Sequence, residues 1–201
     1  MGRREQNKAK KNAALLQAGL ELFLEGGVER TSIEQIAAKA GVARGTFYLY
    51  YDTKEALFET IVDGFLDPLM QIFDRVEAGL ANADGPGAAL SVYQVMAAEL
   101  AMLGLSHQQR VLLLFREMRG PSMDGLRARE LALIERITEL TRLAMDRGLV
   151  EQGDPQLASL VILGGIERLY FEVLIGELEL GSPAELASKA ALLLSRVLGV
   201  G

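Results

Sequence analysis

Residues 32–58, SIEQIAAKAGVARGTFYLYYDTKEALF, constrain the fold of this chain more than any other stretch. Thr31 and Glu34 stand three residues apart just before a periodic apolar run, which predicts a capping box at a helix N-terminus. That helix is expected to end just before Gly41, because glycine suits the left-handed turn that commonly follows a helix. A second short helix is expected at about 43–50, so the segment has the form of a helix-turn-helix.

The second of these helices has one face suited to a protein core and another suited to DNA. Phe47 and Tyr51 are four residues apart and are expected to point inward. The outward positions supply a guanidinium, a hydroxyl and phenols, which suit phosphate and base-edge contacts. They are Arg44, Gly45, Thr46, Tyr48 and Tyr50. The alternative is a helical hairpin with an aromatic core, but that normally has more aliphatic residues and fewer outward phenols.

Lys54 stands at the start of the next predicted helix, which Asp52 or Thr53 would cap. A lysine beside a helix N-terminus is electrostatically unfavourable for the helix. A phosphate bound at this position would offset that cost. Lys54 is therefore a further candidate contact to the DNA backbone.

Residues 13–62 resemble the N-terminal domain of the tetracycline-repressor (TetR) family of bacterial transcription regulators. The resemblance rests on AALLQAGLELFLEGGVERTSIEQIAAKAGV and ARGTFYLYYDTKEALFETI, which match without a gap. It implies an all-α fold, in which a three-helix helix-turn-helix domain precedes a larger helical domain for ligand binding and dimerisation. It also implies a homodimer that binds a palindromic operator in double-stranded DNA.

Carried over position by position, the resemblance implies phosphate contacts at one set of residues and base contacts at another. The phosphate set is Thr31, Ser32, Thr46, Tyr48 and Lys54, and the base-reading set is Arg44, Gly45 and Tyr50. Three positions depart from the usual family pattern: Ala43 replaces a frequent serine, Tyr51 a phenylalanine, and Asp52 a proline or small residue. The first departure removes a hydroxyl that could cap the helix or bind phosphate.

Three segments are expected: a flexible basic tail at 1–9, the DNA-binding domain at 10–53, and the effector-binding and dimerisation domain at 54–201. Residues 1–55 carry nine basic and seven acidic side chains, a net +2, and the rest of the chain carries −8. A slightly basic end on an acidic body is typical of DNA binding at one end. The tail can reach phosphates or a minor groove, or alternatively is a disordered solubilising tail. The cations of the first eleven residues are Arg3, Arg4, Lys8, Lys10 and Lys11.

The rest of the chain is predicted to be helical, since it is rich in Leu and Ala and only 6% of all residues are aromatic. Pro68 lies inside a long predicted helix and is expected to kink or interrupt it. Asp154-Pro155 and Ser182-Pro183 each place a capping residue before a proline at the first helical position. The predicted helices span about 10–25, 53–81, 88–105, 108–119, 123–147, 155–179 and 183–198.

The last two predicted helices are apolar over much of their circumference, which suggests burial against a partner as well as a core. By resemblance they would form a four-helix interface with their copies across a two-fold axis. Gly164-Gly165 would permit close backbone approach there. The alternative is an internally buried pair in a monomer. The expected interface residues are Leu160, Leu163, Leu174, Leu186, Ala190, Leu193, Leu194 and Val197.

A ligand pocket is expected among the middle helices, where the family binds its effectors. Its candidate residues favour a small, mostly apolar effector, although Met and Phe at helical spacing are more often plain core. Arg119 could pair with an anionic head group or stay solvated. The candidates are Phe65, Leu69, Phe73, Met96, Leu100, Leu103, Phe115, Met118, Arg119, Glu167 and Tyr170.

The composition argues against several other classes of protein. The chain has no cysteine and one histidine, His107, so no disulfide framework, metal site or cofactor is expected. It has no nucleophile elbow and no dinucleotide glycine fingerprint, so an enzyme is not expected. No run of about 18 apolar residues indicates a membrane span, and the basic start lacks the apolar stretch of a signal peptide. A cytoplasmic protein is expected.

Two functional hypotheses remain. The first is a ligand-responsive DNA-binding regulator, most often a repressor, in which effector and DNA favour different states and so oppose each other. The second is a DNA-binding dimer controlled by a protein partner, without a small ligand. The sequence does not discriminate between them.

Overall fold

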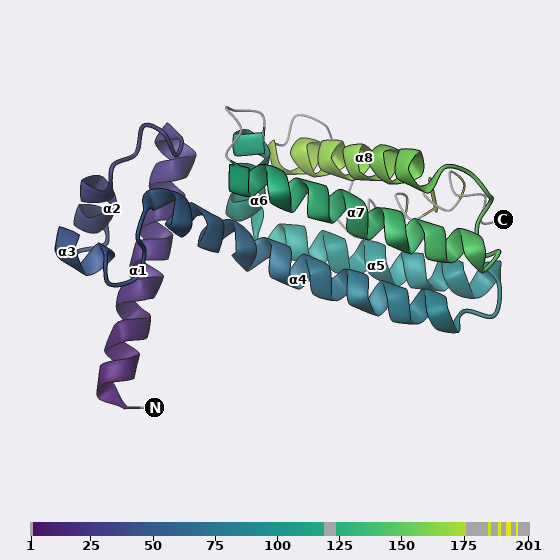
Figure 1. Ribbon diagram of the computed structural model, residues 1–201, viewed down its shortest axis with the longest axis horizontal. Helices are drawn as coiled ribbons and strands as arrows, with labels where there is room; N and C mark the ends of the chain where they lie inside the picture. The colour runs from purple at the N-terminus through teal and green to yellow at the C-terminus, as the bar shows by residue number, and fades with distance from the viewer. Residues whose placement is uncertain are drawn as a thin grey trace. The chain divides into compact units, whose positions relative to one another are not determined.

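The computed structural model describes residues 2–118 and 124–175, together with positions 185, 189, 192, 193 and 196. All regular secondary structure in these residues is α-helical, which confirms the predicted fold class (Figure 1). The helices are α1 (Arg3–Gly26), α2 (Ile33–Lys39), α3 (Arg44–Phe47), α4 (Lys54–Asn82), α5 (Pro86–Ser106), α6 (Gln108–Met118), α7 (Asp124–Asp146) and α8 (Pro155–Ile175). The helix predicted at 183–198 lies outside the described residues, apart from the five positions above.

The chain is built from two compact units. The first comprises Met1–Phe65 and Gln109–Met123, and the second comprises Leu66–Gln108 and Asp124–Gly201. The first unit therefore takes in the start of α4 and nearly all of α6, and extends beyond the segment 10–53 expected from the sequence.

A core of aromatic and aliphatic side chains holds α1, α2, α3 and the start of α4 together. Phe23 of α1 and Phe58 of α4 meet edge to face, with ring centroids 6.1 Å apart. Ile36 of α2 and Phe47 of α3 are fully buried in the same unit. Burial of one such side chain stabilises a fold by about 1.5–3 kcal/mol. These few residues therefore fix where the short helices α2 and α3 lie.

The sequence predicted Thr31 as the N-cap of α2, but the structure shows Ser32 in this role. Ser32 Oγ accepts a hydrogen bond from the Gln35 amide at 3.2 Å, and Gln35 Oε1 accepts one from the Ser32 amide at 2.8 Å. Thr31 is buried and donates to the Gly27 carbonyl at 2.8 Å. The capping box is therefore real but shifted by one residue, because Thr31 is used to close the preceding loop.

The first helix begins at Arg3, so the tail predicted to be flexible at 1–9 is helical over most of its length. The Glu5 carboxylate accepts a hydrogen bond from the Gly2 amide at 2.9 Å, which satisfies one of the free donors at the helix start. A carboxylate in the first turn is also favoured by the helix dipole. The charges of this segment suggest a tail, whereas its local capping favours a helix.

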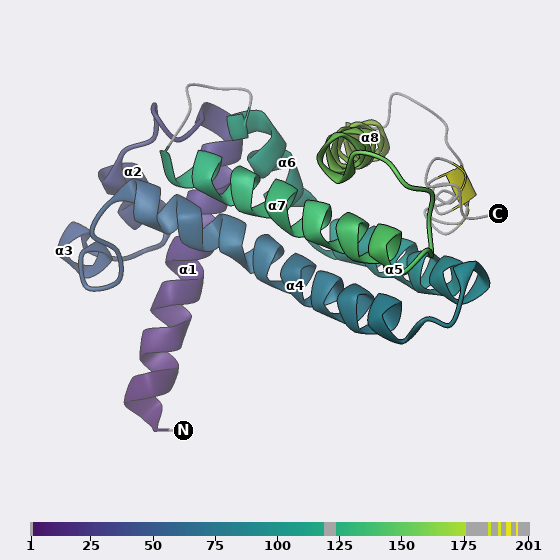
Figure 2. The ribbon, with the colours of Figure 1, turned by 45° about the vertical axis from the view of Figure 1, so that its right-hand side comes forward.

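The second unit packs α7 against the later turns of α4 and against α8. Arg136 of α7 contacts Asp74 and Glu77 of α4, with a nitrogen-to-oxygen distance of 2.8 Å in each pair. Thr138 of α7 and Ser159 of α8 share a buried hydrogen bond of 2.8 Å. Both views place α7 alongside α4 and α5, and Figure 2 shows α8 nearly end on, crossing these helices at an angle.

Two predictions from the sequence fall in this unit, one for the start of α8 and one for Pro68 in α4. Asp154 caps α8 as predicted, since its Oδ1 accepts hydrogen bonds from the amides of Gln156 and Leu157 at 2.9 and 3.1 Å. Pro68 does not interrupt α4, which continues to Asn82. A proline within a helix removes one backbone hydrogen bond, and the packing of α4 along its length outweighs that loss.

Helix α5 is long and apolar enough, by length and composition, to cross a membrane, which the sequence analysis did not recognise. One such helix is weak evidence, because a core helix of a soluble protein can meet the same criterion. Ala89, Tyr93 and Leu100 of α5 are buried.

Candidate nucleic-acid interface and ligand cavity

The helix-turn-helix is formed by α2, a tight turn and α3. Gly41 in the turn has φ +67°, the left-handed conformation that favours glycine. Helix α3 is shorter than the predicted segment 43–50, and the chain continues from it through turns that include the Tyr50 amide bonded to the Phe47 carbonyl at 2.9 Å. Ala43 is the N-cap of α3 and provides no side-chain hydrogen bond. The missing hydroxyl therefore leaves the start of α3 uncapped by a side chain.

The inward face of α3 is formed by Phe47 and Tyr51, as predicted. Phe47 is fully buried, and its ring centroid lies 5.8 Å from that of Tyr51. The Tyr51 hydroxyl donates to Asn12 Oδ1 of α1 at 2.7 Å. Burial raises the pKa of Tyr51 despite this hydrogen bond. Tyr51 therefore links the segment that follows α3 to α1.

The outward face matches the prediction less uniformly. Arg44, Gly45 and Tyr48 are exposed, whereas Thr46 and Tyr50 are half-buried. The Tyr50 hydroxyl donates to the Lys8 carbonyl of α1 at 3.2 Å. Among the described residues, no atom lies within 4 Å of where a Cβ would stand on Gly45, so the backbone is open to a large neighbour there.

Arg44 is held in place by two residues. Its Nη1 lies 2.8 Å from Glu34 Oε1 of α2, and its guanidinium carbon lies 5.9 Å from the centre of the Tyr48 ring. The hydrogen bond with Tyr48 and the nearby Glu34 carboxylate raise the pKa of Arg44. Because all three side chains are exposed, the pair contributes little to stability, but it orients the guanidinium before any ligand binds. This role of Glu34 was not predicted from the sequence.

Three of the expected phosphate contacts make hydrogen bonds within the protein. Thr31 is only 5% exposed, and Ser32 caps α2. Lys54 Nζ donates to the carbonyls of Glu29 and Thr31 at 2.8 and 2.9 Å. These lysine bonds give a physical reason for a cation at this helix start that does not require a phosphate.

Leu49 is a candidate that the sequence analysis missed. It lies between Tyr48 and Tyr50 and is 77% exposed, the most exposed large apolar side chain among the described residues. An exposed aliphatic side chain beside outward phenols suits apolar contact with a thymine methyl group. The signal was present in the sequence, because Leu49 falls outside the inward spacing of Phe47 and Tyr51.

Replacing Lys54 by methionine is expected to have two separable effects. Loss of the two charged hydrogen bonds should lower the free energy of unfolding by about 1.5–3 kcal/mol. If Lys54 also meets a phosphate, binding to all DNA sequences should weaken, and the log–log slope of affinity against salt should become shallower by about 0.9 per protomer. Thermal melting and salt titrations measure the two effects. An unchanged salt slope would restrict Lys54 to holding the loop at 29–31.

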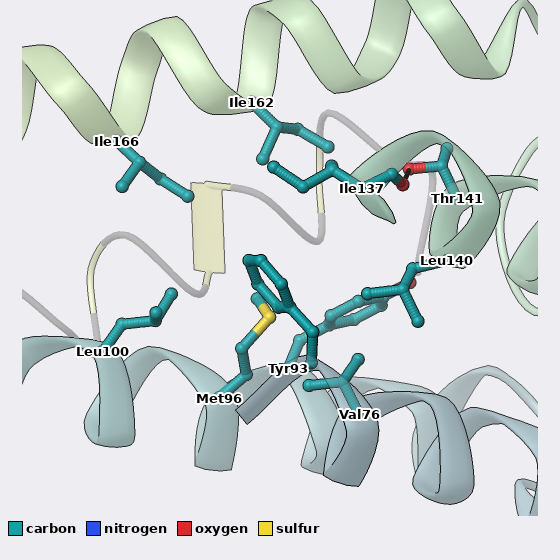
Figure 3. Close-up of a pocket in the computed structure, with 10 residues that line it drawn as sticks. Val76, Tyr93, Met96, Leu100, Ile137, Leu140, Thr141, Ile162 and Ile166 are labelled. Atoms are coloured by element: carbon teal, nitrogen blue, oxygen red, sulfur yellow. Dashed lines mark hydrogen bonds between the residues drawn. The ribbon is translucent and has the colours of Figure 1, made fainter. Parts of the chain in front are cut away.

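An apolar cavity of about 50 Å³ lies in the second unit between α4, α5, α7 and α8. In Figure 3, Ile162 and Ile166 of α8 point towards Met96 and Leu100 of α5 across this space. Burial raises the pKa of Tyr93 to about 12, which keeps its hydroxyl neutral. The lining residues are Phe73, Val76, Tyr93, Met96, Leu100, Ile137, Leu140, Thr141, Ile162 and Ile166.

The predicted pocket residues overlap this cavity only in Phe73, Met96 and Leu100. Phe65, Leu69 and Phe115 are buried but are not among its lining residues, and neither is the half-buried Met118. Leu103 borders an open groove with Ile72 and Met102, and Glu167 is half-buried. The Tyr170 hydroxyl donates to the Leu100 carbonyl, and burial raises the pKa of Tyr170. Arg119 lies outside the described residues.

The described residues include only part of the predicted dimer surface. Leu157, Leu160 and Val161 of α8 are exposed by 61, 47 and 56%, and their spacing places them on one face of the helix. Leu163 is half-buried, and Leu193 is 59% exposed. The side chain of Leu174 is not described, and Leu186, Ala190, Leu194 and Val197 lie outside the described residues.

The chain thus combines a helix-turn-helix unit with a larger helical unit that holds an apolar cavity, which defines a class of helical DNA-binding regulators. Residues 15–61 match the family described as bacterial regulatory proteins, tetR family. Residues 15–61 therefore form a DNA-binding domain of the tetR family, and the chain over most of its length is similar to transcriptional repressors of this kind.

Three relatives show how far this likeness extends. The HTH-type transcriptional regulator YvdT of Bacillus subtilis is 46% identical over 52 residues, which span 26% of this chain and 27% of YvdT. The HTH-type transcriptional repressor BepR of Brucella suis is 25% identical over 88% of this chain and 87% of BepR. The third is NalD, the secondary repressor of the MexAB-OprM multidrug efflux pump in Pseudomonas aeruginosa. Its crystal structure is similar to this one, and the two sequences are 28% identical. It has a TM-score of 0.74 and covers 95% of this chain and 98% of NalD.

Proposed function

We propose that this protein is a homodimeric repressor that binds a palindromic operator in cytoplasmic DNA and leaves it when a small, mostly apolar effector binds. The observation that carries the proposal is the arrangement of α2, α3 and the following turn. Phe47 and Tyr51 fix this segment from inside, while Arg44, Tyr48 and Leu49 stay exposed. A segment of this kind can enter the major groove of DNA. The relatives BepR and NalD, both described as repressors, support the direction of regulation.

The proposed DNA contacts fall into two kinds. Tyr48, Thr46 and Lys54 would bind phosphates, which positions the protein without reading sequence. Arg44 would read base edges, and Leu49 would contact thymine methyl groups. Among the remaining predicted contacts, Ser32 at the start of α2 and Gly45 of α3 can approach the DNA backbone. Thr31 is buried and would act only through the loop that it closes.

Dimerisation is proposed through the exposed apolar face of α8. Leu157, Leu160 and Val161 recur at the spacing of one helix face and leave aliphatic surface in water. Gly164 and Gly165 follow on the same helix, and no described atom lies within 4 Å of where their Cβ atoms would stand. A second copy could therefore approach the backbone closely there. By symmetry, a two-fold interface pairs the same face of both protomers.

An effector is proposed to bind by enlarging the apolar cavity. At about 50 Å³ the cavity is far smaller than the roughly 300–1,000 Å³ that a drug-sized ligand occupies. An effector must therefore favour a conformation of the second unit in which this space is wider. If DNA binds better to the narrow form, effector and DNA weaken each other's binding by the same factor. The lining is almost wholly hydrocarbon, with Thr141 and Tyr93 as its hydroxyl groups, which favours a lipophilic ligand.

Selection of bound duplexes from a random DNA pool by the purified protein tests the DNA-binding part, at about 0.15 M salt. The expected result is an enriched inverted repeat whose half-site centres lie about 34–36 Å apart. A lack of any enriched sequence would contradict the proposal. Enrichment of a single unrepeated site would contradict the two-fold arrangement.

A panel of lipophilic compounds then tests the effector part, with melting temperature and release of the selected duplex as readouts. At least one compound should raise the melting temperature and release the DNA. Ile137→Phe, which fills the cavity, should abolish both responses while keeping DNA affinity. If no lipophilic compound acts and DNA binding persists, control by a protein partner becomes the better explanation.

A further inference from the structure

The first turns of α1 form an exposed helix with a strong positive charge. Residues 2–11 are all exposed. They contain five cations, Arg3, Arg4, Lys8, Lys10 and Lys11, against one acidic residue, Glu5, for a net charge of +4. The first residue of α1 that is fully buried is Leu15. The sequence alone suggested a flexible tail here, whereas the structure shows a regular helix with fixed side-chain directions.

The cations share one side of this helix. With about 100° of rotation per residue, the five basic side chains fall within an arc of about 160°, and Asn7 lies inside it. Glu5, Gln6 and Ala9 lie on the other side. Arg4, Lys8 and Lys11 follow the spacing of i, i+4 and i+7, so they form a continuous stripe along the axis. We call these five side chains the basic face.

The helix that carries the basic face is hydrogen-bonded to the segment that follows α3. The Tyr50 hydroxyl donates to the Lys8 carbonyl at 3.2 Å, and the Tyr51 hydroxyl donates to Asn12 Oδ1 at 2.7 Å. Both tyrosines lie in the segment that follows α3. The helical extension is therefore held in a set direction beside the segment that is proposed to enter the groove.

We propose that the basic face binds the phosphate backbone of duplex DNA just outside the base pairs read by α3 and its turn. The proposal rests on the DNA-binding function and deepens it, because it adds a sequence-independent contact surface from a different helix. Duplex DNA is the partner that fits, since it presents closely spaced negative charges along a line. A membrane surface does not fit, because residues 2–11 include no large apolar side chain to insert.

The length of the basic face fixes where this contact falls. Arg3 to Lys11 spans about 12 Å at 1.5 Å per residue, which corresponds to about three or four base pairs of duplex. Because the extension is helical, its charges are already ordered and bind without the entropy cost of ordering a flexible tail. Flanking DNA should therefore raise affinity without changing sequence preference.

The charge test compares two variants of equal net charge in the full chain. Arg4→Gln/Lys11→Gln removes two cations from the basic face, and Arg127→Gln/Arg142→Gln removes two exposed cations from α7. The probe is the duplex enriched from the random pool. The first variant should make the log–log salt slope shallower by about 1.8 per protomer and keep the base preference. The second should leave the slope as in the wild type. Equal slopes in all three proteins would overturn the proposal.

The length test uses the same duplex cut at the operator edges or extended by about five base pairs on each side, somewhat more than the predicted reach. The wild type should gain affinity about tenfold on extension, and Arg4→Gln/Lys11→Gln should gain much less. Asn7→Gly/Ala9→Gly keeps every charge but weakens the helix, so its gain should also fall. A full gain in the glycine variant would show that a flexible tail suffices and would refute a helical contact surface.

These outcomes separate this proposal from the DNA-binding function itself. Sequence-specific binding with no effect of flanks or of the basic face would reject only the proposal. Absence of wild-type binding to any duplex would reject both.

Discussion

Phe47→Ala is expected to abolish specific DNA binding while the second unit stays folded. Phe47 is fully buried and packs beside Tyr48 and Tyr51, with ring centroids 5.7 and 5.8 Å away. Truncating a buried phenylalanine costs about 3–5 kcal/mol. Helix α3 has only four residues, and so short a helix has no stability of its own in water. Its position therefore depends strongly on the burial of Phe47.

The expected size of this effect follows from the free energy. A loss of about 3–5 kcal/mol corresponds to a weakening of roughly a hundredfold or more in operator affinity, since about 1.4 kcal/mol is one factor of ten. Operator titration gives the affinity, and hydrogen exchange locates the loosened segment. The exchange of buried amides in α7 and α8 should stay slow.

Leu49→Ala is the matched control for the loss of packing in Phe47→Ala, because it truncates a large apolar side chain two residues away that is 77% exposed. It should weaken operator binding only through the proposed contact with thymine methyl groups. Its effect on the free energy of unfolding should stay within about 0.5 kcal/mol. If Phe47→Ala kept wild-type operator affinity, α3 would not be part of the DNA interface.

Arg44→Ala is expected to relax the choice of base at one position of each half-site. A well-placed arginine contributes about 1–3 kcal/mol of discrimination against the wrong base, and a two-fold operator contains that position twice. Repeating the random-pool selection with the variant should give an inverted repeat with the same spacing and one degenerate position per half-site. Unchanged base preference would mean that Arg44 contacts phosphate or only Glu34 and Tyr48.

Glu34→Gln separates the orientation of Arg44 from its charge. The variant keeps the arginine but removes the carboxylate that lies 2.8 Å from it. Affinity for all duplexes should rise modestly, because a negative charge near the phosphates is lost. Base preference should weaken at the same position as in Arg44→Ala, because the guanidinium is no longer oriented. A rise in affinity with undiminished preference would assign Glu34 a purely electrostatic role.

Much of the first unit could be predicted from local sequence. Gly41 marks the turn because its left-handed φ of +67° disfavours other residues. The spacing of Phe47 and Tyr51 gives the inward face, since residues four apart share one side of a helix. Asp154-Pro155 predicts the start of α8, because the Asp154 carboxylate accepts hydrogen bonds from amides two and three residues further along the chain. Each of these features depends on backbone geometry within a few residues.

Predictions from the sequence were wrong where two neighbouring residues could play the same structural role. Thr31 and Ser32 can both cap a helix, and a contact in the preceding loop decides between them: Thr31 donates to the Gly27 carbonyl, which leaves Ser32 for α2. The basic start of the chain has the composition of a tail, yet it continues α1 from Arg3. Charge content alone does not distinguish a solvated helix from a flexible segment.

The all-α fold, the helix-turn-helix and the resemblance of the N-terminal domain to the TetR family could be predicted from the sequence, because these follow from helical periodicity, turn residues and a gapless local pattern. Which side chains line the cavity depends on how the helices pack. Val76, Tyr93, Ile137 and Ile162 come from four different helices, and a helix with apolar residues around its circumference does not indicate which side meets a neighbour. Tertiary packing also placed most of α6 in the first unit. Such choices depend on contacts between residues far apart in the chain, for which local propensity carries no information.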